Sequence, residues 1–91
     1  MENEELLGRL TAEREKMRAV FRGLSIKRND GVSREFMEMA RNYNTDSDYF
    51  FEKRDYIRSF EAVVISWAYV DAGIKAGFFG VGDELKEYFT S

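Results

Sequence analysis

The fold is decided by residues 55–78, which read DYIRSFEAVVISWAYVDAGIKAGF. Bulky apolar side chains recur there three or four positions apart, at Tyr56, Phe60, Val63, Trp67, Val70, Ile74 and Phe78. Because an α-helix turns once in about 3.6 residues, this spacing places them all on one helical face. Asp55 can act as an N-cap, and Gly77 can take the left-handed conformation that commonly ends a helix. We therefore expect one long helix with an apolar face.

Two more helices are expected on the N-terminal side of this one. Over residues 3–24 the apolar positions that share a face are Leu6, Leu10, Met17, Val20 and Leu24. Over residues 32–53 the corresponding stripe is Phe36, Ala40, Tyr43, Ser47 and Phe50, which is partly small and polar. Residues 25–31, SIKRNDG, have the composition of a loop. Short connections make neighbouring helices antiparallel, so the sequence predicts an all-α fold, an antiparallel up-down-up three-helix bundle.

A short helical appendage is expected after the bundle, over residues 83–89, with Leu85, Tyr88 and Phe89 packed against its end. The apolar stripes also predict the main core residues, which are Leu10, Met17, Val20, Phe36, Phe50, Phe60, Val63, Trp67 and Ile74.

Four polar residues near this core are interpreted as structural: Glu13, Tyr43, Asp71 and Lys75. Glu13 interrupts the stripe of residues 3–24, at the level of Tyr43 in the second helix and of Ser66 and Trp67 in the third. A buried carboxylate needs hydrogen-bond donors, so we expect Tyr43, Ser66 or Trp67 to donate one to Glu13.

The other two structural polar residues are Asp71 and Lys75, which stand four apart beside the core stripe of the third helix. Helical positions four apart are neighbours, so we expect an ion pair between them at the rim of the core. We favour this structural role over a binding role for Asp71, because ionisable groups in structural networks also lie close to an apolar core.

The composition limits the catalytic and metal-binding chemistry that the chain can perform. The 91 residues suffice for a single domain over residues 1–91, and the chain has neither cysteine nor histidine. Disulfides, thiolate and imidazole catalysis and the commonest zinc ligands are thereby excluded. Asp46 and Asp48 cannot share a metal ion, because helical positions two apart point about 200° apart. We expect no metal site, no cofactor and no enzymatic activity.

The N-terminal sequence gives no sign of export. Its first five residues, MENEE, are acidic where a secretory signal is basic, and no apolar run is long enough to span a bilayer without a charge. A cytoplasmic protein that does not enter a membrane is the expectation.

A second apolar stripe runs along the third helix, roughly opposite the core stripe. It consists of Ala62, Ile65, Tyr69, Ala72 and Ala76. A helix that is apolar all round is normally buried on more than one side. This stripe either packs on another segment of the same chain or meets a partner. The leading hypothesis is a non-catalytic protein-interaction module that associates through this helix, with itself as a homodimer or with another protein.

The basic residues suggest an alternative. Arg14, Arg18, Arg22, Lys27 and Arg28 form a continuous edge that could bind the phosphates of RNA. Cations near a helix C-terminus also complement its dipole and pair with acidic neighbours. The net charge of −3 and the pI near 5.0 argue against a dedicated nucleic-acid binder. RNA binding is therefore the second hypothesis.

Residues 40–79 carry a family resemblance. Its positions are Ala40, Tyr43, Asp46, Tyr49, Phe50, Asp55, Tyr56, Phe60, Glu61, Ala62, Asp71, Ala72, Gly73, Gly77, Phe78 and Phe79. In these the chain resembles an archaeal all-helical family known only as domain of unknown function 357. The resemblance implies a small three-helix bundle in an archaeal cytoplasm, and it implies no activity. Arg54 stands where members of the family usually have glycine.

Overall fold

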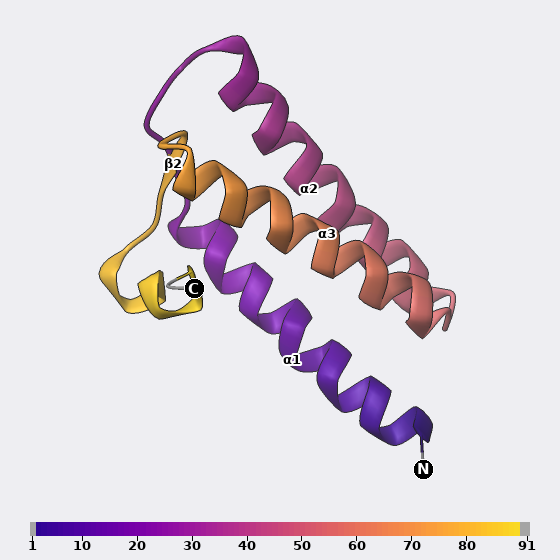
Figure 1. Ribbon diagram of the computed structural model, residues 1–91. Helices are drawn as coiled ribbons and strands as arrows, with labels where there is room; N and C mark the ends of the chain where they lie inside the picture. The colour runs from indigo at the N-terminus through magenta and orange to yellow at the C-terminus, as the bar shows by residue number, and fades with distance from the viewer. Residues whose placement is uncertain (1, 90–91) are drawn as a thin grey trace.

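The computed structural model describes residues 2–89 and is built mainly from three long helices (Figure 1). These are α1 (Glu2–Gly23), α2 (Gly31–Glu52) and α3 (Tyr56–Lys75). Two short strands, β1 (Ser25–Ile26) and β2 (Phe79–Gly80), follow α1 and α3, and the 3₁₀ helix η1 (Asp83–Phe89) comes last. The all-helical class expected from the sequence is confirmed, whereas the two strands were not predicted.

A seam of small buried residues joins α2 to α3. The seam consists of Ser33, Ala40 and Ser47 on α2 and Ser59, Ser66 and Gly73 on α3. Its members stand seven residues apart on each helix, so they face the same side turn after turn. Small side chains let the two backbones approach closely, and the two helices run antiparallel along the seam.

The serine hydroxyls of the seam bond to backbone carbonyls of the opposite helix. Ser47 donates to the carbonyl of Ser59 at 2.9 Å, and Ser59 donates to that of Ser47 at 2.7 Å. Ser66 donates to the carbonyl of Ala40 at 2.7 Å. Each such bond contributes about 1 kcal/mol, and it also satisfies a hydroxyl that would be costly to bury alone. Polar residues therefore build the closest helix contact of the fold.

The helix α1 lies along α3, so that α3 runs between α1 and α2 (Figure 1). The fully buried Leu10, Met17 and Val20 of α1 form the core with Val63 and Val70 of α3. All of these residues except Val70 belong to the predicted core. Across this junction bulky side chains meet, in place of the small residues that line the seam.

Long side chains, rather than close backbones, connect α1 with α2. The guanidinium of Arg14 lies 4.0 Å from the centre of the Phe51 ring and pairs with Asp48 at 2.7 Å. From the other side, the guanidinium of Arg41 lies 5.2 Å from the centre of the Phe21 ring. The earlier position on α1, Arg14, meets the later positions on α2, and the later position, Phe21, meets the earlier Arg41, so α1 and α2 are antiparallel.

The strands close one end of the molecule. Ser25 pairs with Gly80, and Ile26 pairs with Phe79, which ties the segment after α1 to the segment after α3. Gly77 makes the turn out of α3 with a φ of 82°, in the left-handed region that glycine adopts without strain. The ring of Phe79 then folds back onto Gly73, where no larger residue leaves it room.

The structure corrects several expected burials. Four of the nine predicted core residues, Leu10, Met17, Val20 and Val63, are buried, whereas Phe36, Phe50, Phe60, Trp67 and Ile74 are half-buried. Small residues fill the seam, so Phe36 packs its ring against Tyr69 and Phe78, while Trp67 stacks on Phe89 of η1. In η1, Leu85 and Phe89 are buried as predicted, but Tyr88 is 41 % exposed.

Candidate functional site

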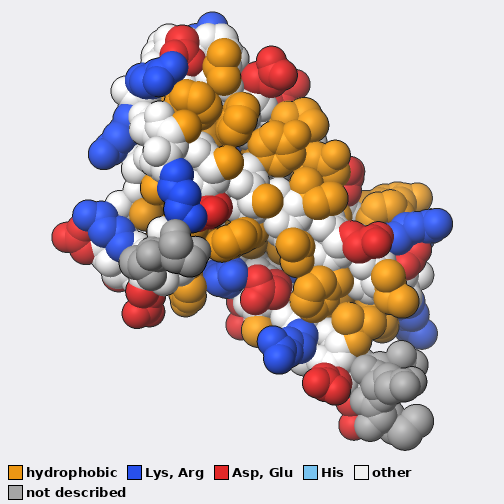
Figure 2. Space-filling model, viewed as in Figure 1, with side chains coloured by type: hydrophobic (Ala, Val, Ile, Leu, Met, Phe, Trp, Pro, Cys, Tyr) orange, Lys and Arg blue, Asp and Glu red, His pale blue; other side chains and the backbone are white. Residues whose placement is uncertain are grey.

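The outward side of α3 carries apolar side chains that the rest of the chain leaves open. Ile57, Val64 and Ile65 are 65 %, 41 % and 39 % exposed. Phe60 is half-buried beside them and Ala68 is exposed one turn further on. We call these five residues the α3 face. Figure 2 shows hydrophobic side chains gathered over α2 and α3, with charged side chains at the margins and in a group near the middle of the view.

The α3 face contains a shallow hollow lined by Phe60, Glu61, Val64 and Ile65. Glu61 is the only charged residue of that lining. The ion pair of Lys75 with Asp71, at 2.9 Å, lies beyond the apolar part of the helix. A surface of this kind can bury apolar area against a partner with little desolvation of charge.

The structure places the predicted partner-binding stripe differently from the expectation. Ala62 is only 6 % exposed, and the ring of Tyr69 lies between Phe36 and Tyr43 of α2, with centroid distances of 5.5 and 6.0 Å. Tyr69 is therefore occupied within the chain, and we correct its assignment as a partner anchor. Ile65, Ala72 and Ala76 are exposed.

The cause of this difference is the seam. Ser59, Ser66 and Gly73 direct α2 to the side of α3 on which Ala62 and Tyr69 also lie. The side left open is consequently that of Ile57 and Val64, which the sequence stripe did not include. The sequence signal for Val64 is its place beside Ile65, which belongs to the predicted stripe, and no pattern marks Ile57.

The expected hydrogen bond to Glu13 is wrong. Glu13 pairs instead with Lys16, one turn along α1, at 2.7 Å, and its side chain is 33 % exposed. Ser66 donates to Ala40, and Tyr43 stacks on Tyr69. Glu13 does lie at the level of Trp67, since both line one hollow with Lys16 and Val64. Tyr43 and Ser66 have other partners because α1 lies along α3 and does not enter the space between α2 and α3. No group among residues 2–89 accepts a hydrogen bond from the buried indole N–H of Trp67.

The ion pair predicted between Asp71 and Lys75 is present, since the ammonium nitrogen of Lys75 lies 2.9 Å from both carboxylate oxygens of Asp71. The side chain of Asp71 is 17 % exposed and that of Lys75 46 %. These values place the pair at the rim of the core.

The predicted basic edge divides into paired and unpaired cations. The side chain of Arg14 is only 11 % exposed and holds Asp48, so it has a structural role. Arg28 donates to Asp30 at 2.7 and 3.0 Å. Within the part of the chain that the structure describes, Arg18, Arg22 and Lys27 are exposed and have no carboxylate in ion-pair distance.

Asp30 is the N-cap of α2. Its carboxylate accepts hydrogen bonds from the backbone N–H and the hydroxyl of Ser33, both at 2.8 Å. The backbone N–H of Ser33, followed by the side chain of Arg28, holds the pKa of Asp30 well below its usual range. Arg28 thus stabilises the start of a helix, and this leaves three of the five predicted edge residues available to an anion.

Neither a metal site nor a membrane span is visible in the part of the chain that the structure covers. No three acidic residues between positions 2 and 89 converge as metal ligands. None of the described helices is long and apolar enough to cross a membrane.

The fold and these surfaces define a small helical protein in which a tightly joined pair of helices, α2 and α3, carries a third helix on one side. The chain belongs to the family described as protein of unknown function DUF357, whose model matches residues 9–79. The crystal structure of protein AF1782 from Archaeoglobus fulgidus, of the same family, is similar. The match has a TM-score of 0.75 at 28 % sequence identity and covers 90 % of this chain and 100 % of that one. No curated protein matches the chain significantly in sequence.

Proposed function

We propose that this chain is a non-catalytic, cytoplasmic protein-interaction module, an up-down-up three-helix bundle that self-associates through the α3 face. The observation that supports the proposal is the exposure of Ile57, Val64 and Ile65 on one side of a helix whose other sides are packed. Isolated apolar residues are common on protein surfaces, but a contiguous group on one helix is typical of an interaction site.

A second copy of the chain is the partner that we propose for this face. If two copies of α3 cross in antiparallel fashion about a twofold axis between Val64 and Ile65, each Glu61 lies over Ala68 of the other copy. The two carboxylates then stay apart, and the small Ala68 leaves room for a close helix approach. Antiparallel packing also sets opposite helix dipoles side by side. Such an isologous contact should bury on the order of 1,000 Å² or more in total.

Sedimentation equilibrium with two matched variants tests this proposal. Val64→Glu places two like charges near the axis and should weaken association by about tenfold or more. The control is Val32→Glu, because Val32 is also exposed, at 52 %, but lies at the start of α2. We expect wild type and Val32→Glu to dimerise alike, and circular dichroism should show all three chains folded. A wild-type chain that remains monomeric at the highest soluble concentration would overturn self-association.

RNA binding by Arg18, Arg22 and Lys27 is the second candidate, and their exposure without acidic partners is what favours it. Replacement of all three by methionine removes the charges and keeps long side chains. If the basic edge binds RNA, the wild type should show a steep loss of RNA affinity with rising salt, and the triple variant should not. Affinity equal in both proteins would exclude these residues as the site.

A further inference from the structure

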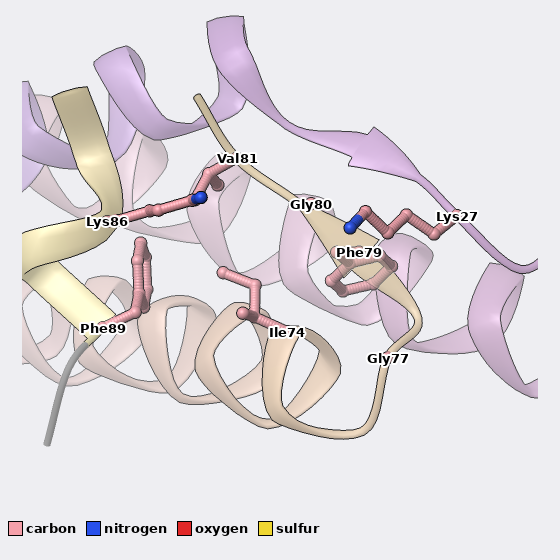
Figure 3. Close-up of a pocket in the computed structure, with 8 residues that line it drawn as sticks. All are labelled: Lys27, Ile74, Gly77, Phe79, Gly80, Val81, Lys86 and Phe89. Atoms are coloured by element: carbon pink, nitrogen blue, oxygen red, sulfur yellow. The ribbon is translucent and has the colours of Figure 1, made fainter. Parts of the chain in front are cut away.

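The end of the molecule closed by β1 and β2 contains a pocket with a volume of about 360 Å³ (Figure 3). Its walls come from four parts of the chain: the end of α3, the β2 strand, the segment after β1, and η1. The apolar walls are formed by Ile74, Phe79, Val81 and Phe89. This volume lies at the lower end of the range for small-molecule sites, roughly 300–1,000 Å³.

Two lysines supply the charge of the pocket. Figure 3 shows Lys27 and Lys86 reaching from opposite sides toward the stretch at Gly80 and Val81. No carboxylate is among the lining residues. Lys27 has no ion pair within residues 2–89, whereas Lys86 holds Asp83 at 2.8 Å.

The pair of Lys86 with Asp83 does not prevent an anion from using Lys86. The side chain of Asp83 is 92 % exposed and that of Lys86 64 %. Water therefore screens the attraction between the two charges, and the pair is weak. An ammonium group has three donors and can serve two acceptors at once. The C-terminal carbonyls of α3, which would repel an anion, are partly satisfied, since Gly73 and Ile74 accept from Phe78 and Gly77.

From this geometry we infer that the pocket is a binding site for a small organic anion, a carboxylate or phosphate carried on a short apolar body. The apolar body would contact Ile74 and Phe89, and the anionic group would lie between the ammonium groups of Lys27 and Lys86. Neutral or cationic compounds with the same apolar body cannot make the contact with the two ammonium groups, so they should bind more weakly. The site is at the opposite end of α3 from Ile57, so it stands independently of the proposed self-association.

The chain contains its own reporter for binding. Trp67 is the only tryptophan, and its ring stacks on Phe89 with 6.0 Å between centroids and 12° between planes. A ligand that contacts Phe89 should therefore change the fluorescence of Trp67. The backbone amides of Gly77 and Gly80, both of which line the pocket, provide a second signal by NMR.

Four probes with the same eight-carbon chain test the inference, each kept below its micelle concentration: octanoate, octyl phosphate, 1-octanol and octylamine. We expect at least one of the two anions to shift the Gly77 and Gly80 amides and to bind about tenfold more tightly than 1-octanol and octylamine. Comparison of octanoate with octyl phosphate then identifies the preferred anionic group. Equal affinity for 1-octanol and both anions, or unchanged amides with all four probes, overturns the inference.

Four variants separate the effect of the two pocket lysines from that of net charge. Lys27→Met and Lys86→Met should each weaken anion binding by about threefold to fivefold, and together they should remove the preference over 1-octanol. Lys53→Met is the control, because Lys53 follows α2 at the other end of the molecule and its loss changes the net charge equally. A double variant that keeps the preference, or a control that loses it, contradicts the assignment.

Gly80→Ala tests the geometry without any change of charge. A Cβ at Gly80 would lie 2.7 Å from Cε of Lys27, so the lysine side chain must move away from its place along the pocket. We expect anion binding to weaken about as much as in Lys27→Met, by threefold to fivefold, while the circular dichroism and the unfolding midpoint stay close to wild type. Unchanged binding in this variant would show that the position of Lys27 does not matter.

Discussion

A single methyl group at Gly73 should disturb this fold more than at any other helical glycine of the described chain, because a Cβ there would meet two ring carbons of Phe79 at 2.2 and 2.3 Å. Carbon atoms in contact are about 3.5–4.0 Å apart, so the ring must move by more than about 1 Å. Phe79 is only 2 % exposed and its backbone pairs with Ile26, which leaves it little freedom. Overpacking costs about 1–3 kcal/mol, whereas helical alanine is better than glycine by about 0.5–1 kcal/mol. We expect Gly73→Ala to lower the free energy of unfolding by roughly 1–2 kcal/mol.

The matched control is Gly8→Ala in α1, where a Cβ would meet no atom within 4 Å. Only the higher helix propensity of alanine acts there, so this variant should raise the free energy of unfolding by about 0.5–1 kcal/mol. Urea unfolding followed by circular dichroism measures both, and a shift of about 4–8 °C in Tm accompanies each kcal/mol in a domain of this size. If Gly73→Ala stabilises the chain as much as Gly8→Ala, the packing of Phe79 onto Gly73 has been misassigned.

Three further predictions concern the ends and the centre of the helix pair. Arg54 has a φ of 61°, in the left-handed region, so Arg54→Gly should stabilise the chain by about 1 kcal/mol in urea unfolding, and a loss of stability would refute strain at this turn. Ser47→Val adds bulk to the seam and removes a hydrogen bond, which should cost about 2–4 kcal/mol, while Thr45→Val on the exposed side of α2 should change little. The lowered pKa of Asp30 stabilises the fold above the unfolded pKa of about 4, and this contribution is lost as the pH falls further. Asp30→Asn keeps a capping oxygen but cannot titrate, so its unfolding free energy should fall less steeply below about pH 4 than that of wild type, and equal slopes would contradict the role of Asp30.

The helices themselves were largely predictable from the sequence. The predicted residues 32–53 and the observed α2, Gly31–Glu52, differ by one residue at each end. Asp55 accepts from the backbone N–H of Arg58 as an N-cap should, and Gly77 has the expected positive φ. Apolar periodicity and capping chemistry act over a few residues, so the chain itself contains enough information to place these boundaries.

The packing of the helices was much less predictable. The stripe of bulky residues on α3 indicates one core side, but Ser59 and Ser66, which make the closest contact, are polar by type and carry no weight in an apolar pattern. Without these serines, the apolar pattern does not show which side of α3 faces α2. It therefore assigns Tyr69 to a partner, although the ring packs against α2. The pairing of Arg14 with Asp48 spans 34 residues of sequence and depends on helix placement in the same way.

The contact between α2 and α3 differs in kind from the contacts that hold α1. This difference implies an order in which the helices separate. The α2 and α3 helices are joined by a turn of only three residues and by backbone contact along the seam, so few dihedral angles need to be fixed to form them. By contrast, α1 is held by side chains that can separate without breaking the seam. Amide protons of α1 should therefore exchange with solvent through partial unfolding, while those beside Ser47 and Ser66 exchange only when the whole chain unfolds. On this prediction α1 is the first helix to separate, and the α2–α3 pair is the last part of the fold to open.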